Sequence, residues 1–202
     1  MRRRKGGRGA VDFLVATIFI LGVAGLAALL QTWNSREMAG AVRVIDGDSI
    51  MIDGADVRLR GIDAPELGQQ CMGDDGARYP CGQLAANHLE TLIDGNPVVC
   101  TGHDTDRYGR FLGVCRKAGG DHAASLNAMM VEDGWAVAYG GHDRLERLAQ
   151  AERRGLWAWR FERPADWRRQ RAAADAQAPP RAGFGAAIRR IRSWIGWGGH
   201  DE

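Results

Sequence analysis

The sequence predicts an α+β fold, a five-stranded β-barrel with helices packed against it. Three observations lead to this prediction. Short β-branched runs follow one another closely and are separated by Asp-Gly turns, a strong signal for β-hairpins. Later strands alternate with segments in which apolar residues recur at helical spacing. These elements fall within residues 41–160, a length that suits one small domain.

Three strands in tight succession open this domain. The β-branched runs occupy residues 41–45, 49–52 and 57–62, and the segments between them read DGD and DGAD. This spacing indicates a meander. A helix is expected next over residues 82–93, with apolar residues at helical spacing and an Asp-Gly pair at its end.

Two further strands are expected at 97–101 and 111–115, and two helices at 125–132 and 143–154. A short extended segment is expected at 135–139. Five short strands with interspersed helices fit a small barrel, and an OB-like barrel is one such arrangement. The spacing alone leaves other α+β arrangements open.

Charge is distributed unevenly along the chain. The net charge is +4 over residues 1–40, −5 over residues 41–160 and +3 over residues 161–202. The middle segment is therefore acidic. If it binds a phosphodiester, it must use a few placed arginines and a cation rather than a diffuse basic surface.

The N-terminal segment has the features of a membrane signal. Residues 1–10 hold five Lys or Arg, and residues 13–30 carry no charge. A helix of that length would span roughly 27 Å, close to the thickness of the bilayer hydrocarbon. We therefore expect a cytoplasmic basic segment at 1–10, a transmembrane helix at 11–30 in the cell membrane, and delivery of the rest out of the cytoplasm. A cleaved signal peptide is the alternative.

The four cysteines agree with export. They lack the spacing of a zinc site. In an oxidising compartment we expect two disulfides, Cys71–Cys81 around a Gly/Asp-rich loop and Cys100–Cys115 across a strand–turn–strand segment. The sequence alone allows three pairings, and four buried free thiols are the alternative.

Composition sets the boundaries of the predicted domain. Residues 31–40 are expected to form a linker, 41–162 the domain and 163–202 a basic tail. Within the tail, residues 184–197 place three isoleucines and a tryptophan on one helical face and arginines off it. Such an amphipathic helix suits a membrane interface or a nucleic-acid strand, and a solvated tail is the alternative.

Three motifs in the domain carry charged residues, and they read VIDGDSI at 44–50, VRLRGIDAPE at 57–66 and DRYGR at 106–110. Each motif by itself is modest evidence, because a sequence such as DGD is usually only a turn. Three further sequences continue the pattern, LN at 126–127, GWA at 134–136 and RGLW at 154–157. In this order, the six sequences resemble those of the staphylococcal nuclease (thermonuclease-like) family over about residues 41–160.

The resemblance implies a Ca²⁺ site. Matched motif by motif, Asp48 and Asp63 are the metal-binding carboxylates, and the residue after Asp63 contributes its backbone carbonyl. Hard carboxylate oxygens suit Ca²⁺ better than a soft metal. The residue after Asp63 is often Thr in the family and is Ala64 here, so the carbonyl is kept and any role of the hydroxyl is lost. Asp46 is expected beside the metal, supporting its ligands.

The resemblance also implies three catalytic residues. Glu66 matches the carboxylate that positions the attacking water and is the candidate general base. Arg58 and Arg110 match two arginines that hold the phosphate, for which a bidentate guanidinium is better suited than Lys. Plain packing is the favoured interpretation of Tyr108 and Tyr139, with seating of the nucleotide as the alternative.

The predicted function is that of a monomeric, membrane-anchored nuclease. It would hydrolyse DNA or RNA with Ca²⁺ and little sequence specificity, and the resemblance implies 5′-hydroxyl and 3′-phosphate products. Its expected partners are a nucleic-acid substrate and the membrane, contacted by the N-terminal helix and, in one interpretation, by the basic tail. The alternative is a catalytically inactive domain of the same fold that binds nucleic acid or protein, in which the charged residues form a structural ion-pair network.

Overall fold

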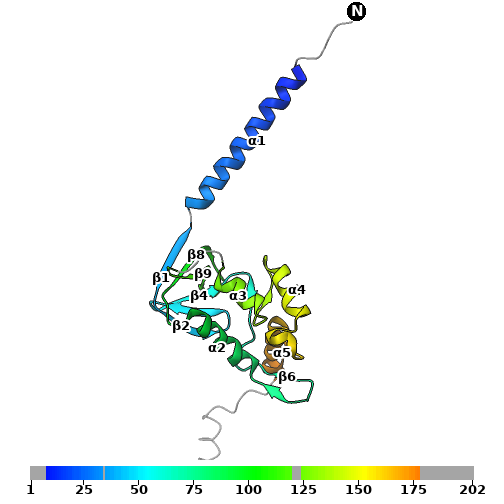
Figure 1. The fold of residues 1–202 in the computed structure, drawn as a ribbon. Helices are drawn as coiled ribbons and strands as arrows, with labels where there is room; N and C mark the ends of the chain where they lie inside the picture. Colours follow the sequence, from blue (N-terminus) through cyan, green and yellow to red (C-terminus); the bar gives the residue numbers. More distant parts are fainter. Residues whose placement is uncertain (1–7, 34, 120–123, 178–202) are drawn as a thin grey trace, which may run out of the picture. The chain divides into compact units, whose positions relative to one another are not determined.

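The structure is a computed structural model that describes residues 8–33, 35–119 and 124–177 of the chain. The chain divides into two compact units, Met1–Phe161 and Glu162–Glu202. The first unit contains the sheets and the helices that surround them (Figure 1).

The residues of the expected transmembrane segment are helical, in α1 (Arg8–Trp33). The side chains described for this helix, residues 11–27, are exposed. Crossing a bilayer takes about 20 consecutive, predominantly apolar residues. The predicted transmembrane span is not found, because no helix in the described part of the chain combines the length and the apolar character that a crossing requires.

A six-stranded sheet forms the centre of the first unit, in the spatial order β1-β8-β9-β4-β3-β2. The strands are β1 (Arg36–Gly40), β2 (Val42–Asp46), β3 (Ser49–Ile52), β4 (Ala55–Leu59), β8 (Val98–Thr105) and β9 (Phe111–Lys117). Neighbouring strands are antiparallel except β4 and β9, which are parallel. Strands β2 to β4 form the predicted meander.

The sheet is curled, and it has one strand more than the predicted barrel. Strand β1 contacts β3 although β8, β9 and β4 lie between them in the sheet order, so the sheet bends back on itself. The α+β class is confirmed, whereas the five-stranded barrel is corrected to a curled, six-stranded mixed sheet. The added strand, β1, lies in the predicted linker 31–40 and has no β-branched residue. Pairing with β8 along its whole length makes it a strand.

Two short sheets lie beside the main one. Strand β5 (Ile62–Asp63) pairs with β10 (Val137–Ala138), which confirms the extended segment expected at 135–139. The predicted strand 57–62 is interrupted before β5, where Gly61 adopts a φ of 82°. Strands β6 (Cys71–Met72) and β7 (Arg78–Tyr79) form a hairpin that the sequence analysis did not predict.

The expected helices are present, as α2 (Cys81–Ile93), α3 (Leu126–Glu132) and α4 (Asp143–Ala151), followed by the 3-10 helix η1 (Gly155–Ala158). Helix α2 contacts β2, and α3 contacts both β9 and α4. The hydroxyl of Ser125 caps α3 by accepting a hydrogen bond from the N–H of Ala128 at 3.1 Å. Helix α4 ends three residues before the predicted position, because Arg153 has a φ of 54°.

A buried asparagine joins α3 to two strands. The amide of Asn127 donates hydrogen bonds to the carbonyl oxygens of Arg60 at 2.9 Å and Gly113 at 3.1 Å. Its carbonyl oxygen accepts a hydrogen bond from the N–H of Cys115 at 2.9 Å. A buried amide satisfied in this way fixes the end of β4 against β9.

Both expected disulfides are confirmed. Cys100–Cys115 joins directly paired residues of β8 and β9 inside the main core. Cys71–Cys81 joins β6 to the first residue of α2 and packs in a second, smaller core with Leu156. Each links two segments that the sheet or helix packing has already brought close.

The second unit contains helix α5 (Pro164–Gln177), which falls within the predicted tail. The amphipathic helix expected at 184–197 lies outside the described residues.

Candidate active site

Two buried aspartates share one arginine. Asp48 and Asp63 are 3% and 6% exposed. Nη2 of Arg58 donates to Oδ2 of Asp48 at 2.9 Å and to Oδ1 of Asp63 at 2.7 Å. These three residues, here called the carboxylate cluster, come from β4 and from the two segments predicted to carry the metal ligands.

The turn between β2 and β3 positions Asp48. Oδ1 of Asp46 accepts a hydrogen bond from the N–H of Asp48 at 3.0 Å, the local contact that makes Asp favourable in turns. The residue between them must be glycine, because a Cβ atom at Gly47 would lie 2.7 Å from Cβ of Ala64 and 2.9 Å from Cβ of Ala85. The glycine of the DGD sequence therefore allows the Asp48 turn to pack closely against the segment that follows β5.

Both oxygens of Asp48 are held. Oδ1 accepts a hydrogen bond from the hydroxyl of Ser49 at 3.0 Å. Oδ2 accepts one from the N–H of Ala64 at 3.0 Å, in addition to that from Arg58. The main chain of Ala64, whose carbonyl is the predicted third metal ligand, thus lies against the carboxylate of Asp48.

The carboxylate cluster contains more acids than bases. Burial raises the pKa of Asp48 from 3.8 to about 7. Arg58 lowers this pKa, whereas Asp46 and Asp63 raise it. One guanidinium therefore does not offset the burial of the neighbouring carboxylates, and a further cation would stabilise the ionised form of Asp48.

The carboxylate cluster can supply part of the ligand set of a Ca²⁺ ion. Ca²⁺ binds oxygen ligands at about 2.3–2.6 Å. One oxygen of Asp48 and one of Asp63 already converge on a single cationic atom, Nη2 of Arg58. Among the residues that the structure describes, no group of three or more His, Cys, Asp or Glu side chains could hold a metal ion. Main-chain, water or phosphate oxygens would have to complete the coordination.

Glu66 follows the carboxylate cluster along the chain and is half-buried. Its carbonyl oxygen accepts a hydrogen bond from the N–H of Gln69 at 2.7 Å, and the carbonyl oxygen of Gln69 accepts one from the N–H of Gly82 at 3.2 Å. A Cβ atom at Gly82 would lie 1.8 Å from the carbonyl oxygen of Glu66. Together with the Cys71–Cys81 disulfide, these contacts fix the Glu66 segment to the first turn of α2.

The DRYGR motif forms the turn between β8 and β9. Oδ1 of Asp106 accepts hydrogen bonds from the N–H groups of Tyr108 and Arg110 at 2.9 and 3.0 Å. Its Oδ2 accepts from Nε and Nη2 of Arg110 at 2.8 and 2.7 Å. Burial raises the pKa of Asp106, but the hydrogen bonds from Arg110 and Tyr108 outweigh it and hold the pKa below 3.8. Asp106 is therefore ionised at neutral pH and fixes the guanidinium of Arg110.

The two predicted phosphate-holding arginines lie next to each other in the sheet order: Arg58 is in β4, and Arg110 directly precedes β9, which pairs with β4 in parallel. Val57 of β4 pairs with Phe111 of β9, and both side chains are buried. Arg58 pairs with Leu112, and both are partly exposed. If the alternation of side chains continues one residue before β9, we expect Arg110 on the face of the sheet that carries Arg58 and Leu112.

Comparison with known proteins identifies the family of this chain. A family model described as "Staphylococcal nuclease homologue" matches residues 56–159, more than half of the chain. The chain belongs to the staphylococcal nuclease family. The matched residues include Arg58, Asp63, Glu66 and Arg110, whereas Asp48 lies before them.

Several known proteins are similar to this chain. Succinoglycan biosynthesis protein ExoI of Rhizobium meliloti (strain 1021) is 36% identical over 66% of this chain and 73% of its own length. Protein ParB of Escherichia coli is 34% identical over 72% of this chain and 92% of its own length. The micrococcal nuclease of Shigella flexneri is 34% identical over 63% of this chain and 78% of its own length. Family membership and the nucleases among its relatives identify the chain as a phosphodiester-hydrolysing nuclease.

The site of this nuclease is assembled from three supports. Asp48, Arg58 and Asp63 contact one another directly, with the main chain of Ala64 against Asp48. The Glu66 segment is supported by the start of α2, and Arg110 by Asp106. The individual roles of these residues stay predictions.

Sequence reasoning missed one supporting residue and misjudged two tyrosines. Asp106 of the DRYGR motif has no role in the sequence prediction, although an Asp four residues before an Arg in a tight turn is a readable signal for such a pair. The packing interpretation of Tyr108 and Tyr139 is wrong, since they are 69% and 59% exposed. The ring of Tyr108 instead lies beside the guanidinium groups of Arg107 and Arg110, at 4.8 and 5.6 Å.

Proposed function

We propose that this nuclease hydrolyses DNA or RNA with little sequence specificity and depends on Ca²⁺. The observation that carries the proposal is the single guanidinium of Arg58 between two buried carboxylates, with the second arginine directly before the adjacent strand. Phosphodiester cleavage needs positive charge beside the phosphate oxygens and an activated water in line with the leaving oxygen. The site offers residues of both kinds.

Asp48, Asp63 and the carbonyl of Ala64 would hold the Ca²⁺ ion. When bound, the ion would supply positive charge against the phosphate and the carboxylates. The acid excess around Asp48 supports this assignment, because a cation relieves the penalty of ionising a buried carboxylate.

Arg58 and Arg110 would hold the scissile phosphate through charge-assisted hydrogen bonds. Glu66 would orient a water molecule and accept its proton as the water oxygen attacks phosphorus. The new oxygen–phosphorus bond forms while the bond to the 5′ oxygen breaks, which leaves a 3′-phosphate and a 5′-hydroxyl. Asp106 supports this proposal because it is ionised and fixes Arg110 by two contacts of its guanidinium.

We also propose that the domain works outside the cytoplasm, at the cell membrane, as a monomer. Two disulfides in a small domain support an oxidising compartment. The basic N-terminal sequence supports delivery across the membrane. Protease added to intact cells should digest the domain, and protection of the domain until the cells are lysed would contradict this location.

The activity is tested by digestion of single-stranded DNA, duplex DNA and RNA by the full-length chain. Cleavage should appear with Ca²⁺, disappear with a chelator and fall by about two orders of magnitude or more in Glu66→Gln. Glu90→Gln, on the exposed surface of α2, is the matched control and should cleave normally. Binding without cleavage under all of these conditions would favour the non-catalytic alternative.

A further inference from the structure

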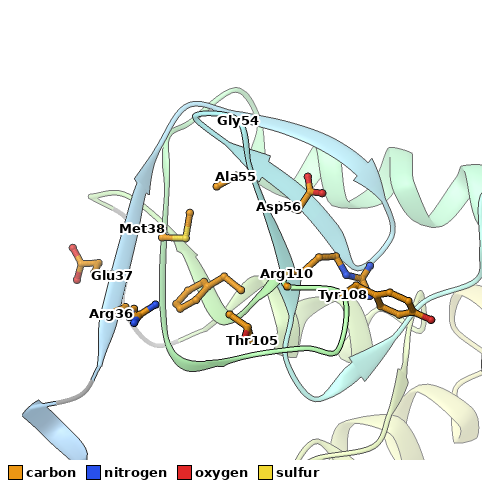
Figure 2. Close-up of a pocket in the computed structure, with 11 residues that line it drawn as sticks. Arg36, Glu37, Met38, Gly54, Ala55, Asp56, Thr105, Tyr108 and Arg110 are labelled. Carbon is orange, nitrogen blue, oxygen red and sulfur yellow. The ribbon is translucent and has the colours of Figure 1, made fainter.

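A cavity of ≈ 670 Å³ adjoins the Arg110 side of the site. It lies between the start of β1, the turn between β3 and β4, and the segment from Thr105 to Phe111 (Figure 2). Its volume falls in the range of about 300–1,000 Å³ that is usual for small-molecule sites. Asp48, Asp63 and Glu66 do not line it, whereas Arg110 does. The cavity therefore borders Arg110 and is not part of the carboxylate cluster.

Strand β1 supplies one wall of the cavity. Figure 2 shows Arg36 and Met38 turned toward the interior and Glu37 turned away, as expected for alternating positions of a strand. Met38 is half-buried and Arg36 is exposed. This wall precedes the residues matched by the family model, so it is a feature of this chain beyond the matched segment.

The lining combines apolar side chains with two cationic residues, Arg36 and Arg110, and two acidic residues, Glu37 and Asp56. Met38 and Phe111 are apolar, and Phe111 is 7% exposed. Arg36 and Arg110 lie on opposite walls, and the exposed ring of Tyr108 stands beside Arg110. A flat apolar group with a phosphate on each side would place the group beside Met38 and Phe111 and the phosphates beside the two arginines. Single-stranded nucleic acid has that chemistry, because each base has an apolar face and lies between two phosphates.

We propose that this cavity, here called the β1 cavity, binds the nucleotide next to the scissile phosphate. Its base lies beside Met38 and Phe111, and its outer phosphate is held by Arg36. The inference rests on the proposed role of Arg110, which places the scissile phosphate at one end of the cavity. It deepens the proposed function by naming a nucleotide-binding subsite on a strand that the catalytic residues do not use.

The test is binding of a fluorescently labelled single-stranded oligonucleotide, measured by anisotropy at several salt concentrations with a chelator present to prevent cleavage. Each lost phosphate contact on a single strand reduces the slope of log K against log salt by about 0.7. Arg36→Ala should show this reduction and weaken binding by roughly three- to tenfold. Arg43→Ala is the matched control, because Arg43 is an exposed arginine of β2 that does not line the cavity; its slope should equal that of the wild type.

Steady-state cleavage separates this inference from the proposed function. With Ca²⁺, Arg36→Ala should raise KM and leave kcat unchanged, and an abasic site on one side of a single cleavable linkage should raise the wild-type KM more than one on the other side. If the wild type cleaves but Arg36→Ala matches Arg43→Ala in both slope and KM, the β1 cavity is not a subsite. If the wild type does not cleave at all and Arg36→Ala still loses the salt slope, the proposed catalysis fails while the binding subsite stands.

Discussion

The carboxylate cluster and the turn that carries Asp106 both join arginine to aspartate, but they differ in burial and in charge balance. In the cluster, one guanidinium contacts two aspartates that are almost fully buried, and a third aspartate lies beside them. In the turn, one aspartate contacts one arginine and two backbone N–H groups close to the surface. Burial dominates in the first and raises the pKa of Asp48, whereas hydrogen bonds dominate in the second and lower the pKa of Asp106.

This difference indicates what the carboxylate cluster and the Asp106 turn, the two halves of the site, are each suited to do. The cluster has an excess of negative charge, which suits the binding of a cation. The turn is balanced and rigid, which suits the presentation of a fixed guanidinium to an anion. Both regions are built from aspartate and arginine. Burial and charge balance thus distinguish the region suited to bind a metal from the region suited to hold a phosphate.

Replacing the arginines should have the largest effect and should separate the two halves. Arg58→Ala and Arg110→Ala should each lower kcat by about 10³-fold, because each removes charge stabilisation of the phosphate. Only Arg58→Ala should change Ca²⁺ affinity, since Arg58 contacts both predicted ligands. Isothermal titration with Ca²⁺ and single-turnover cleavage measure the two quantities. Equal changes of Ca²⁺ affinity in both variants would remove the distinction between the halves.

Replacing the aspartates tests the same comparison from the acidic side. Asp48→Asn should weaken Ca²⁺ binding by about 10- to 100-fold, because a neutral amide is a poorer ligand for a hard cation. Asp106→Asn should leave Ca²⁺ affinity unchanged and lower kcat by about tenfold, since Arg110 loses its fixed orientation. An unchanged Ca²⁺ affinity in Asp48→Asn would contradict the assignment of Asp48 as a ligand.

The pKa values predict opposite pH dependences for the two aspartates. In the metal-free protein the pKa of Asp48 is about 7 instead of 3.8, so the folded state binds this proton more tightly than the unfolded chain. That contribution to stability is fully present below pH 3.8 and is lost as the pH rises through 7. For Asp106, whose pKa is lowered, the contribution is present above 3.8 and is lost as the pH falls through its folded-state pKa.

Ca²⁺ binding should follow the titration of Asp48. Below pH 7, affinity should fall by up to about tenfold per pH unit, because the proton must leave before the metal binds. Titrations at pH 6, 7 and 8, with thermal melts in chelator at the same values, check both expectations. Asp48→Asn should remove the pH dependence of the melts near neutrality, and its persistence there would assign the effect to another group.

Replacing the two disulfides should have the smallest effect. It tests how the Glu66 segment is held against α2. Replacing Cys71 and Cys81 with serine should lower kcat by up to about tenfold without changing Ca²⁺ affinity, because the Glu66 segment loses a link to α2. Replacing Cys100 and Cys115 should lower the melting temperature and leave kcat within about twofold, since that bridge lies in the core. If kcat falls equally in both double variants, the Cys71–Cys81 bridge has no special relation to Glu66.

Much of the fold was predictable because its signals are local. Asp-Gly turns, β-branched runs and helical periodicity place most strands and helices within a few residues of their observed bounds. Strand β1 was missed because its REMAG sequence carries no strand propensity and depends on pairing with β8. The transmembrane span was predicted from the run of uncharged residues, and no such span is found in the described part of the chain.

The sequence by itself determined the residue types of the site and their order along the chain, and it favoured the two disulfide pairings that the structure confirms. Only the tertiary structure decided that Asp48 and Asp63 meet at the guanidinium of Arg58, and that the strand after Arg110 pairs with the strand of Arg58. The physical reason is the parallel pairing of β4 with β9 across some fifty residues of chain, which no local pattern encodes. Burial is likewise a property of the assembled core, and it gives the same residue type, aspartate, a raised pKa at Asp48 and a lowered one at Asp106.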